Sequence, residues 1–213
     1  MKYCASAVRT GLVNYESGNL RSVSKALEHC GAGVTMIERP EDFAGIEALV
    51  LPGVGAFGDA ATSLRRRGLW QPVADWLAAD RPFLGICLGY QLLFERSEES
   101  PGVDGFGLLP GAVVKFTRAP RRKIPHMGWN TIEPTAAAPG MFAALNTTPY
   151  FYFVHSYYPA PADPALVAAW CDYDGRFAAA VARGRLLATQ FHPEKSQDNG
   201  LRVLANFLAE ASR

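Results

Sequence analysis

The sequence predicts an α/β fold in which a mostly parallel central sheet is flanked by helices, with a β-rich C-terminal half. Three observations support this prediction. Short apolar runs alternate with amphipathic segments of helical length, which is typical of βαβ units. Glycine-rich turns follow two of these runs. From Gly107 onward, short strand-like runs are separated by Gly, Pro and Asn. The length of 213 residues favours one domain spanning residues 1–213.

The N-terminal half is expected to supply the parallel strands and most of the helices. Asn19 is a plausible N-cap for an amphipathic helix that stops at Gly31. The expected strands are residues 7–13, 34–37, 48–51 and 83–86. The expected helices are residues 20–29, 59–67, 71–79 and 88–94.

The C-terminal half is expected to consist of short strands, closed by one amphipathic helix. The polar segments 97–102 and 135–140 are read as loops. The expected strands are residues 112–116, 129–133, 150–155, 165–171, 178–183 and 187–190, and the last helix is 200–211.

Composition and charge indicate a soluble cytoplasmic protein. The formal net charge is +1, so no overall field favours nucleic acid or a membrane surface. No apolar stretch reaches membrane-spanning length, and residues 1–10 lack the apolar core of a signal peptide. The four cysteines stand far apart without a Cys-x-x-Cys pair, which argues against a zinc site or a disulfide framework. We expect neither a metal nor a cofactor.

The segment 83–91 is a candidate nucleophile site. Its pattern around Cys87 is Gly-x-Cys-x-Gly, the thiol counterpart of the Gly-x-Ser-x-Gly elbow between a strand and a helix. Glycines suit a sharp turn that lifts the nucleophile out of the backbone. A helix N-terminus beside the sulfur would favour the thiolate. A buried structural cysteine is the alternative.

A glycine-rich loop, residues 52–58, follows the third expected strand. It could be a tight turn, or a loop whose backbone N–H groups bind phosphate or an oxyanion. It lacks the Lys-Ser/Thr of a Walker loop. An oxyanion hole fits better if Cys87 lies on the neighbouring strand.

His192 and Glu194 end the last expected strand and could complete a catalytic triad. In an extended chain, side chains two residues apart leave the same face, so the carboxylate could hold one imidazole nitrogen while the other faces Cys87. His155 and His126 are rival bases, but neither has a carboxylate two residues away. The basic run 118–123 is most simply a solvated loop, with docking of an acidic partner surface as the alternative.

These motifs resemble the class I (triad-type) glutamine amidotransferases, which have a flavodoxin-like fold. The superfamily signatures are residues 85–91, 52–55 and 191–194. Further segments are similar to the glutaminase subunits of imidazole glycerol phosphate synthase: residues 18–23, 51–57, 125–130, 152–157 and 192–196. One departure is the first turn, where the family usually has Asp-Tyr-Gly and this chain has Asn14-Tyr15-Glu16.

The resemblance implies glutamine hydrolysis by a triad of Cys87, His192 and Glu194. It implies that the N–H groups of Val54 and Leu88 bind the oxyanion. The glutamine head group and backbone would contact Gly55, Gln91, Glu99, Ser156 and Tyr157.

The resemblance also implies a tightly bound partner, a cyclase subunit with a (β/α)₈ barrel. This cyclase would receive the ammonia, and the two subunits together would act in histidine biosynthesis. On family grounds, Asn14, Trp129 and Lys195 are assigned to the docking face. The rival interpretations are the glutaminase of another synthase (of anthranilate or pyridoxal phosphate), a non-catalytic regulatory subunit on the same fold, and a cysteine peptidase.

Overall fold

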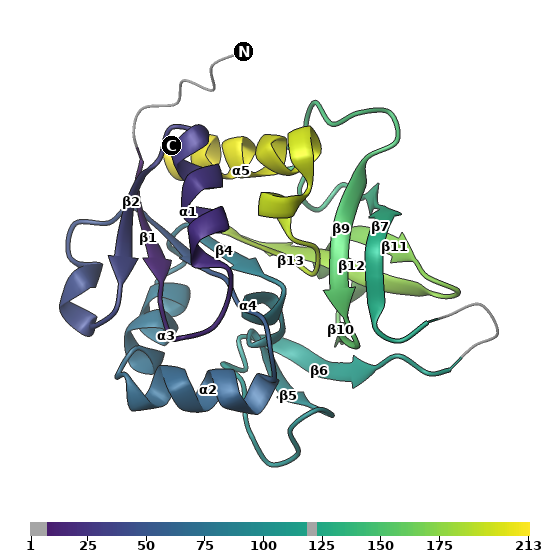
Figure 1. Ribbon diagram of the computed structural model, residues 1–213, viewed down its shortest axis with the longest axis horizontal. Helices are drawn as coiled ribbons and strands as arrows, with labels where there is room; N and C mark the ends of the chain where they lie inside the picture. The colour runs from purple at the N-terminus through teal and green to yellow at the C-terminus, as the bar shows by residue number, and fades with distance from the viewer. Residues whose placement is uncertain (1–7, 119–122) are drawn as a thin grey trace.

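An eight-stranded sheet forms the centre of the protein (Figure 1), in a computed structural model that describes residues 8–118 and 123–213. The strand order is β2-β1-β3-β4-β13-β12-β11-β8. The five strands from β2 to β13 pair in parallel, and the last three pair antiparallel. The strands are β1 (Arg9–Val13), β2 (Gly33–Ile37), β3 (Ala48–Leu51), β4 (Phe83–Ile86), β8 (Glu133–Pro134), β11 (Val167–Asp172), β12 (Arg176–Arg183) and β13 (Leu186–Thr189).

Helices cover both faces of the parallel part because its strands are apolar on both sides. In β3, Ala48 and Val50 belong to one core, with α1 (Leu20–His29) and α5 (Gln197–Ala211). The alternate residues of β3 belong to the second core, with α2 (Phe57–Arg66) and α3 (Trp70–Ala78). The predicted α/β arrangement with a mostly parallel sheet is confirmed.

The β-rich half adds two small sheets next to the carboxyl ends of the parallel strands (Figure 1). One has the order β10-β6-β5, and the other pairs β7 with β9. Their bounds are β5 (Phe94–Ser97), β6 (Leu109–Lys115), β7 (His126–Thr131), β9 (Tyr150–His155) and β10 (Tyr157–Pro161).

The helix expected over residues 88–94 is wrong in length. The helix α4 spans only Leu88–Gln91, and Phe94 begins β5, where it pairs in parallel with Leu109 of β6. This pairing is non-local, so the local apolar pattern could not reveal it. Only one helical turn therefore follows Cys87. Its dipole is much smaller than that of the longer helix that was expected beside the sulfur.

Strand β10 is not among the expected strands, and it contains Pro159 and Pro161, which are unusual in a sheet. It is tolerated because β10 is the edge strand of its sheet. Other boundaries differ by a few residues. The short 3₁₀ helix Pro164–Leu166 precedes β11, α2 begins at Phe57, and α5 begins at Gln197. Of the basic run 118–123, residues 119–122 lie outside the described residues.

The first turn brings the loop before α1 close to the end of α2. Glu16 has a positive φ of 70°, a conformation that favours glycine. Its carboxylate pairs with Arg66 and Arg67 of the α2 terminus at 2.5 and 2.6 Å. Asn19 then caps α1, as expected, by accepting from the N–H of Ser22.

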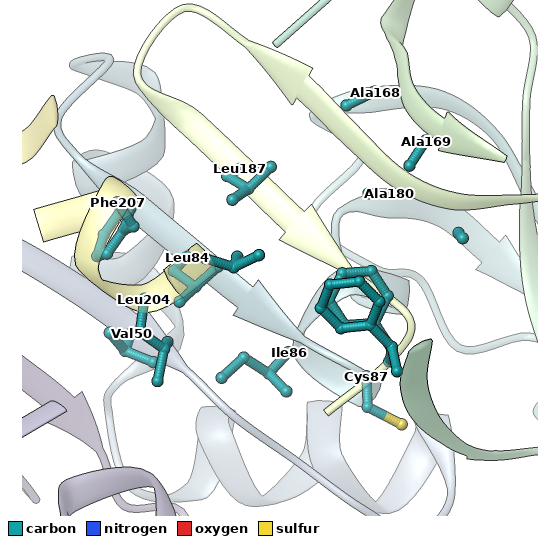
Figure 2. Close-up of a cluster of buried hydrophobic side chains, with 14 of the residues drawn as sticks. Val50, Leu84, Ile86, Cys87, Ala168, Ala169, Ala180, Leu187, Leu204 and Phe207 are labelled. Atoms are coloured by element: carbon teal, nitrogen blue, oxygen red, sulfur yellow. The ribbon is translucent and has the colours of Figure 1, made fainter. Parts of the chain in front are cut away.

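Cys87 lies at the end of a continuous core. Figure 2 shows Leu84 and Ile86 of β4 leading to Cys87, with Leu204 and Phe207 of α5 packed nearby. In the described part of the chain, no helix is long and apolar enough to cross a membrane.

Candidate active site

Cys87 sits at a strained corner between β4 and α4, as the glycine pattern predicted. Its φ is 54° and its ψ is −100°, in a region that side-chain-bearing residues rarely adopt. A Cβ on Gly89 would lie 1.8 Å from the carbonyl oxygen of Leu51, and one on Gly85 would lie 2.9 Å from the carbonyl oxygen of Gly89. Both glycines are therefore required by close backbone approach around the turn.

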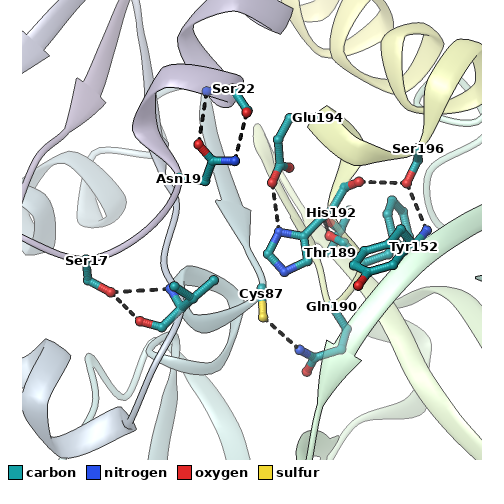
Figure 3. A network of polar contacts seen from close by, with 12 residues as sticks. Ser17, Asn19, Ser22, Cys87, Tyr152, Thr189, Gln190, His192, Glu194 and Ser196 are labelled. Atoms are coloured by element: carbon teal, nitrogen blue, oxygen red, sulfur yellow. Dashed lines mark hydrogen bonds and ion pairs between the residues drawn. The ribbon is translucent and has the colours of Figure 1, made fainter. Parts of the chain in front are cut away.

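A histidine and a carboxylate lie beside this corner. The Nδ1 of His192 donates to Oε1 of Glu194 at 2.8 Å, and the two side chains are 3% and 1% exposed. Figure 3 shows the imidazole between the Glu194 carboxylate and the Cys87 sulfur. The Nε2 of His192 has no hydrogen-bond partner among the described residues. It is therefore free to exchange a proton with the sulfur or with a substrate.

The backbone that brings His192 and Glu194 together differs from the extended chain expected. Strand β13 ends at Thr189, and Pro193 begins the short 3₁₀ helix Pro193–Lys195. Proline has its φ already set for such a turn and needs no donor at this position. The pairing was predicted correctly, but a turn produces it.

The surroundings of His192 favour its protonated form. Burial alone would lower the pKa of the imidazole. The negative charge of Cys87, together with the hydrogen bond to Glu194 and its charge, outweighs burial and raises the pKa to about 10. A positive imidazolium beside the sulfur stabilises a thiolate, which is the nucleophilic form of cysteine.

The peptide unit between Gly53 and Val54 points its carbonyl oxygen toward the turn at Cys87 and Leu88. The Gly53 carbonyl accepts from the N–H of Leu88 at 3.3 Å. On the opposite side, the N–H of Val54 donates to Oγ of Ser17 at 3.3 Å, and the Ser17 hydroxyl donates to the Val54 carbonyl. Both N–H groups expected to bind an oxyanion are thus engaged within the protein.

One cavity of about 510 Å³ collects most of the expected site residues. Its lining includes Cys87, both residues of the expected oxyanion hole, all five expected substrate residues, and Lys195. The lining residues used below are Val54, Gly55, Cys87, Leu88, Gln91, Glu99, His155, Ser156, Tyr157 and Lys195. They come from five separate segments of the chain. Three of these segments follow β3, β4 and β13 at the carboxyl edge of the parallel strands, where open α/β sheets bind ligands.

Two of the expected substrate residues also hold the structure together. Glu99 accepts the first free N–H of α2, from Phe57, at 2.8 Å through Oε2. Gln91 donates to the Tyr157 carbonyl at 3.0 Å. These contacts leave Oε1 of Glu99 and Oε1 of Gln91 for other partners.

The rival base His155 lines the same cavity, but both of its nitrogens are occupied. Nδ1 bonds the Tyr157 carbonyl at 2.9 Å, and Nε2 bonds Nδ1 of His126 at 3.1 Å. Burial lowers the pKa of His155 to about 3 and that of His126 to about 4. Neither imidazole has a free nitrogen next to Cys87, which leaves His192 as the base that the geometry favours.

The comparisons with known proteins agree with this geometry. The family model of class I glutamine amidotransferases matches residues 11–211. The chain belongs to the class I glutamine amidotransferase family. Relatives named "Imidazole glycerol phosphate synthase subunit HisH" include one from Rhodopirellula baltica, 50% identical over 92% of this chain and 95% of the relative. Another, from Methylococcus capsulatus, is 49% identical over 92% of this chain and 94% of that relative.

A solved structure supports the fold. The structure titled "Structure of PurLQS from Thermotoga maritima" aligns with a TM-score of 0.76 at 21% identity, covering 95% of this chain and 98% of the other. At this identity the likeness concerns the fold alone, and it confirms the predicted fold class.

Two of the three residues assigned to a docking face of the amidotransferase lie beside the same ring: Trp129 contacts Tyr152 with the ring centres 6.1 Å apart, and Lys195 lies on that ring as well. Trp129 is 47% exposed on β7, near the exposed Met127 and Tyr150. Asn14 donates to Glu38 at 2.8 Å in the turn after β1. Lys195 lies at the cavity, with its Nζ 5.8 Å from the centre of the Tyr152 ring.

Sequence reasoning gave no role to three polar residues of the amidotransferase site. Gln190 donates from Nε2 to the Cys87 sulfur at 3.5 Å. Ser196 donates to the His192 carbonyl at 2.6 Å and accepts from the N–H of Tyr152 at 3.0 Å (Figure 3). Ser17 holds the Val54 peptide. Gln190 and Ser196 flank the His-Pro-Glu motif, which was the signal available in the sequence.

Proposed function

We propose that the chain hydrolyses glutamine to glutamate and ammonia, as the glutaminase subunit of imidazole glycerol phosphate synthase in histidine biosynthesis. One observation carries the proposal: Cys87 at a strained turn opens onto the cavity beside a buried His192–Glu194 pair. The relatives named for that synthase, matching nearly the whole chain, support the choice of reaction. We treat residues 1–213 as one amidotransferase domain.

The chemistry would run in two stages. The Cys87 thiolate attacks the side-chain amide carbon of glutamine, and the carbonyl electrons move to the oxygen. When this intermediate collapses, Nε2 of His192 gives its proton to the leaving nitrogen, which departs as ammonia and leaves a thioester. Nε2 then takes a proton from water, whose oxygen attacks the thioester to release glutamate and the thiolate. Glu194 holds Nδ1–H and stabilises the imidazolium.

The oxyanion hole would form when one peptide unit turns. At present the Gly53 carbonyl occupies the N–H of Leu88, and the N–H of Val54 points to Ser17. Rotating the peptide between Gly53 and Val54 would free the first N–H and direct the second toward the substrate. Neighbouring glycine lowers the cost of such a rotation. We propose that the loaded cyclase partner favours the turned state.

The glutamine substrate would lie in the cavity with its amide at Cys87. We propose that Gly55, Gln91, Glu99, Ser156 and Tyr157 bind its head group and backbone, since all five line the cavity. Glu99 would use Oε1, because Oε2 already accepts from the α2 terminus.

The partner would be a cyclase with a (β/α)₈ barrel, because released ammonia must reach an acceptor before it is protonated. The exposed apolar residues around Trp129 suit a protein interface. We propose that Trp129, Lys195 and Asn14 belong to that docking face. We further propose a cytoplasmic location, since Cys30, Cys87 and Cys171 are free thiols.

A glutaminase assay tests the proposal. Glutamate release is measured for the chain alone, with a barrel cyclase, and with the cyclase and its nucleotide ligand. We expect the rate to rise in this order and to vanish in Cys87→Ala. An electrophilic glutamine analogue should label the wild type at Cys87. If neither glutamate nor labelling is detected in any mixture, the chain is a non-catalytic subunit. Co-purification with a different synthase would instead favour another amidotransferase.

A further inference from the structure

Gln190 is a buried amide next to the reacting sulfur. It follows the last residue of β13 and is 0% exposed, and its backbone N–H donates to the Ala179 carbonyl at 2.8 Å. Its side-chain Nε2 lies 3.5 Å from the Cys87 sulfur (Figure 3). The role that this side chain can play depends on which end of the amide faces the sulfur, because only the nitrogen can donate.

One backbone carbonyl determines that orientation. The Tyr157 oxygen can only accept, so the end of the Gln91 amide that lies 3.0 Å from it must be the nitrogen. The second hydrogen of that nitrogen points to Gln190, whose nearest atom at 3.3 Å must then be Oε1. The other end of the Gln190 amide, which faces Cys87, is therefore the N–H donor.

The Tyr157 carbonyl is itself held from a second side. Nδ1 of His155 lies 2.9 Å from it and must donate, which leaves Nε2 of His155 as an acceptor for Nδ1–H of His126 at 3.1 Å. Burial keeps both imidazoles neutral by lowering the pKa of each. The two histidines thus fix the position of the Tyr157 carbonyl. This carbonyl orients the Gln91 amide, and the Gln91 amide in turn orients the Gln190 amide.

We propose that Gln190 is a further catalytic residue, whose amide N–H donates to the Cys87 sulfur and stabilises its thiolate form. The proposal rests on the glutaminase function above and adds a residue to it. A thiolate accepts such a hydrogen bond more strongly than a neutral thiol does, so the donor shifts the balance toward the nucleophile. Gln91 and the Tyr157 carbonyl act as positioning groups for this donor.

Two other titratable groups interact electrostatically with the same sulfur and must stay constant in a test. They are His192 from the loop after β13 and Tyr15 from the turn after β1, whose phenol stays neutral because burial raises its pKa. Substitutions at Gln190 leave both groups in place.

The experiment measures the rate at which iodoacetamide alkylates Cys87 as a function of pH, with the alkylated residue identified by mass spectrometry. Gln190→Met keeps the length of the side chain without a donor. Gln190→Glu keeps the shape but faces the sulfur with a carboxylate. Thr189→Val is the matched control, because Thr189 is equally buried and hydrogen-bonds the Phe191 carbonyl rather than the sulfur. Circular dichroism checks that each variant is folded.

We expect the pH midpoint of alkylation to rise by about one pH unit in Gln190→Met, further in Gln190→Glu, and not at all in the control. In the complex with the cyclase, kcat should fall about tenfold in Gln190→Met while KM stays within twofold, because Gln190 does not line the cavity. An unchanged midpoint in both Gln190 variants overturns the proposal. A wild-type complex that releases no glutamate defeats the glutaminase function instead, and the alkylation result still stands on its own.

Discussion

Replacing Glu194 by glutamine should separate the effect of its negative charge in the proposed triad from the effect of its shape. The carboxylate is almost fully buried, and its Oε1 accepts from Nδ1 of His192 at 2.8 Å. Glutamine has the same size and can keep the acceptor, but it cannot stabilise the imidazolium with a negative charge. The substitution therefore acts on the step in which His192 carries the proton.

The expected magnitude follows from the contacts of the carboxylate. A buried hydrogen bond to a charged group contributes about 1.5–3 kcal/mol, and about 1.4 kcal/mol corresponds to a tenfold change in rate. We expect kcat of Glu194→Gln to fall about 10- to 150-fold. KM should stay within twofold, because Glu194 does not line the cavity.

The same substitution should also lower stability. The second oxygen of Glu194 is buried without a hydrogen-bond partner in the described residues. An amide nitrogen placed there would be an unpaired buried donor, which costs about 1–3 kcal/mol. The free energy of unfolding, measured by urea denaturation, should fall by that amount.

The assays are glutamate release by the complex with its cyclase and an NMR titration of His192. The pKa of the imidazole should be lower in the variant than in the wild type, because the charge of Glu194 and its hydrogen bond raise it. Glu210→Gln is the control. Glu210 is also paired, with Arg213 at the protein surface, and its loss should leave kcat within twofold. A Glu194→Gln variant with wild-type kcat and an unchanged His192 pKa would refute this account of the triad.

Three further predictions follow from other parts of the structure. Gly89→Ala places a methyl group 1.8 Å from the Leu51 carbonyl oxygen. The clash should lower the free energy of unfolding by about 1–3 kcal/mol and abolish glutaminase activity. An unchanged melting temperature would contradict this prediction. Burial lowers the pKa values of His126 and His155 in the folded state to about 4 and about 3. Just below pH 6.5 these two histidines therefore bind protons only in the unfolded chain. The free energy of unfolding should then fall on acidification by up to about 1.4 kcal/mol per pH unit for each histidine. Replacing both by asparagine should make the urea-measured slope shallower, and equal slopes would argue against it. Trp129→Ala should weaken cyclase binding about 10- to 100-fold by calorimetry without altering alkylation of the nucleophile, whereas unchanged affinity would place Trp129 outside the interface.

The parallel strands were predicted closely because they depend on short, continuous apolar runs. Strands β3 and β4 have the predicted bounds, and every residue in them is buried. Helix α1 also has its predicted bounds, since Asn19 caps it and its apolar residues recur at helical spacing. The pairing of His192 with Glu194 was predicted from their separation of two residues, although the backbone between them is a turn.

The incorrect secondary-structure predictions concern segments whose conformation depends on strands distant in the sequence. Phe94 was expected to be helical and instead pairs with Leu109, and β10 forms although its two prolines argue against a strand. In both cases β6 supplies the backbone hydrogen bonds, and no short-range pattern indicates that it lies alongside.

The sequence by itself determined the positions of the parallel strands β3 and β4, the glycine-framed turn at Cys87 and the pairing of His192 with Glu194, because each depends on residues close together in the chain. Only the tertiary structure decided the directions of the hydrogen bonds around the sulfur. Gln190 meets Cys87 across 103 residues of chain, and Val54 meets Ser17 across 37. Which atom of an amide faces the nucleophile depends on a carbonyl from a third segment, and folding alone brings these groups within hydrogen-bond distance.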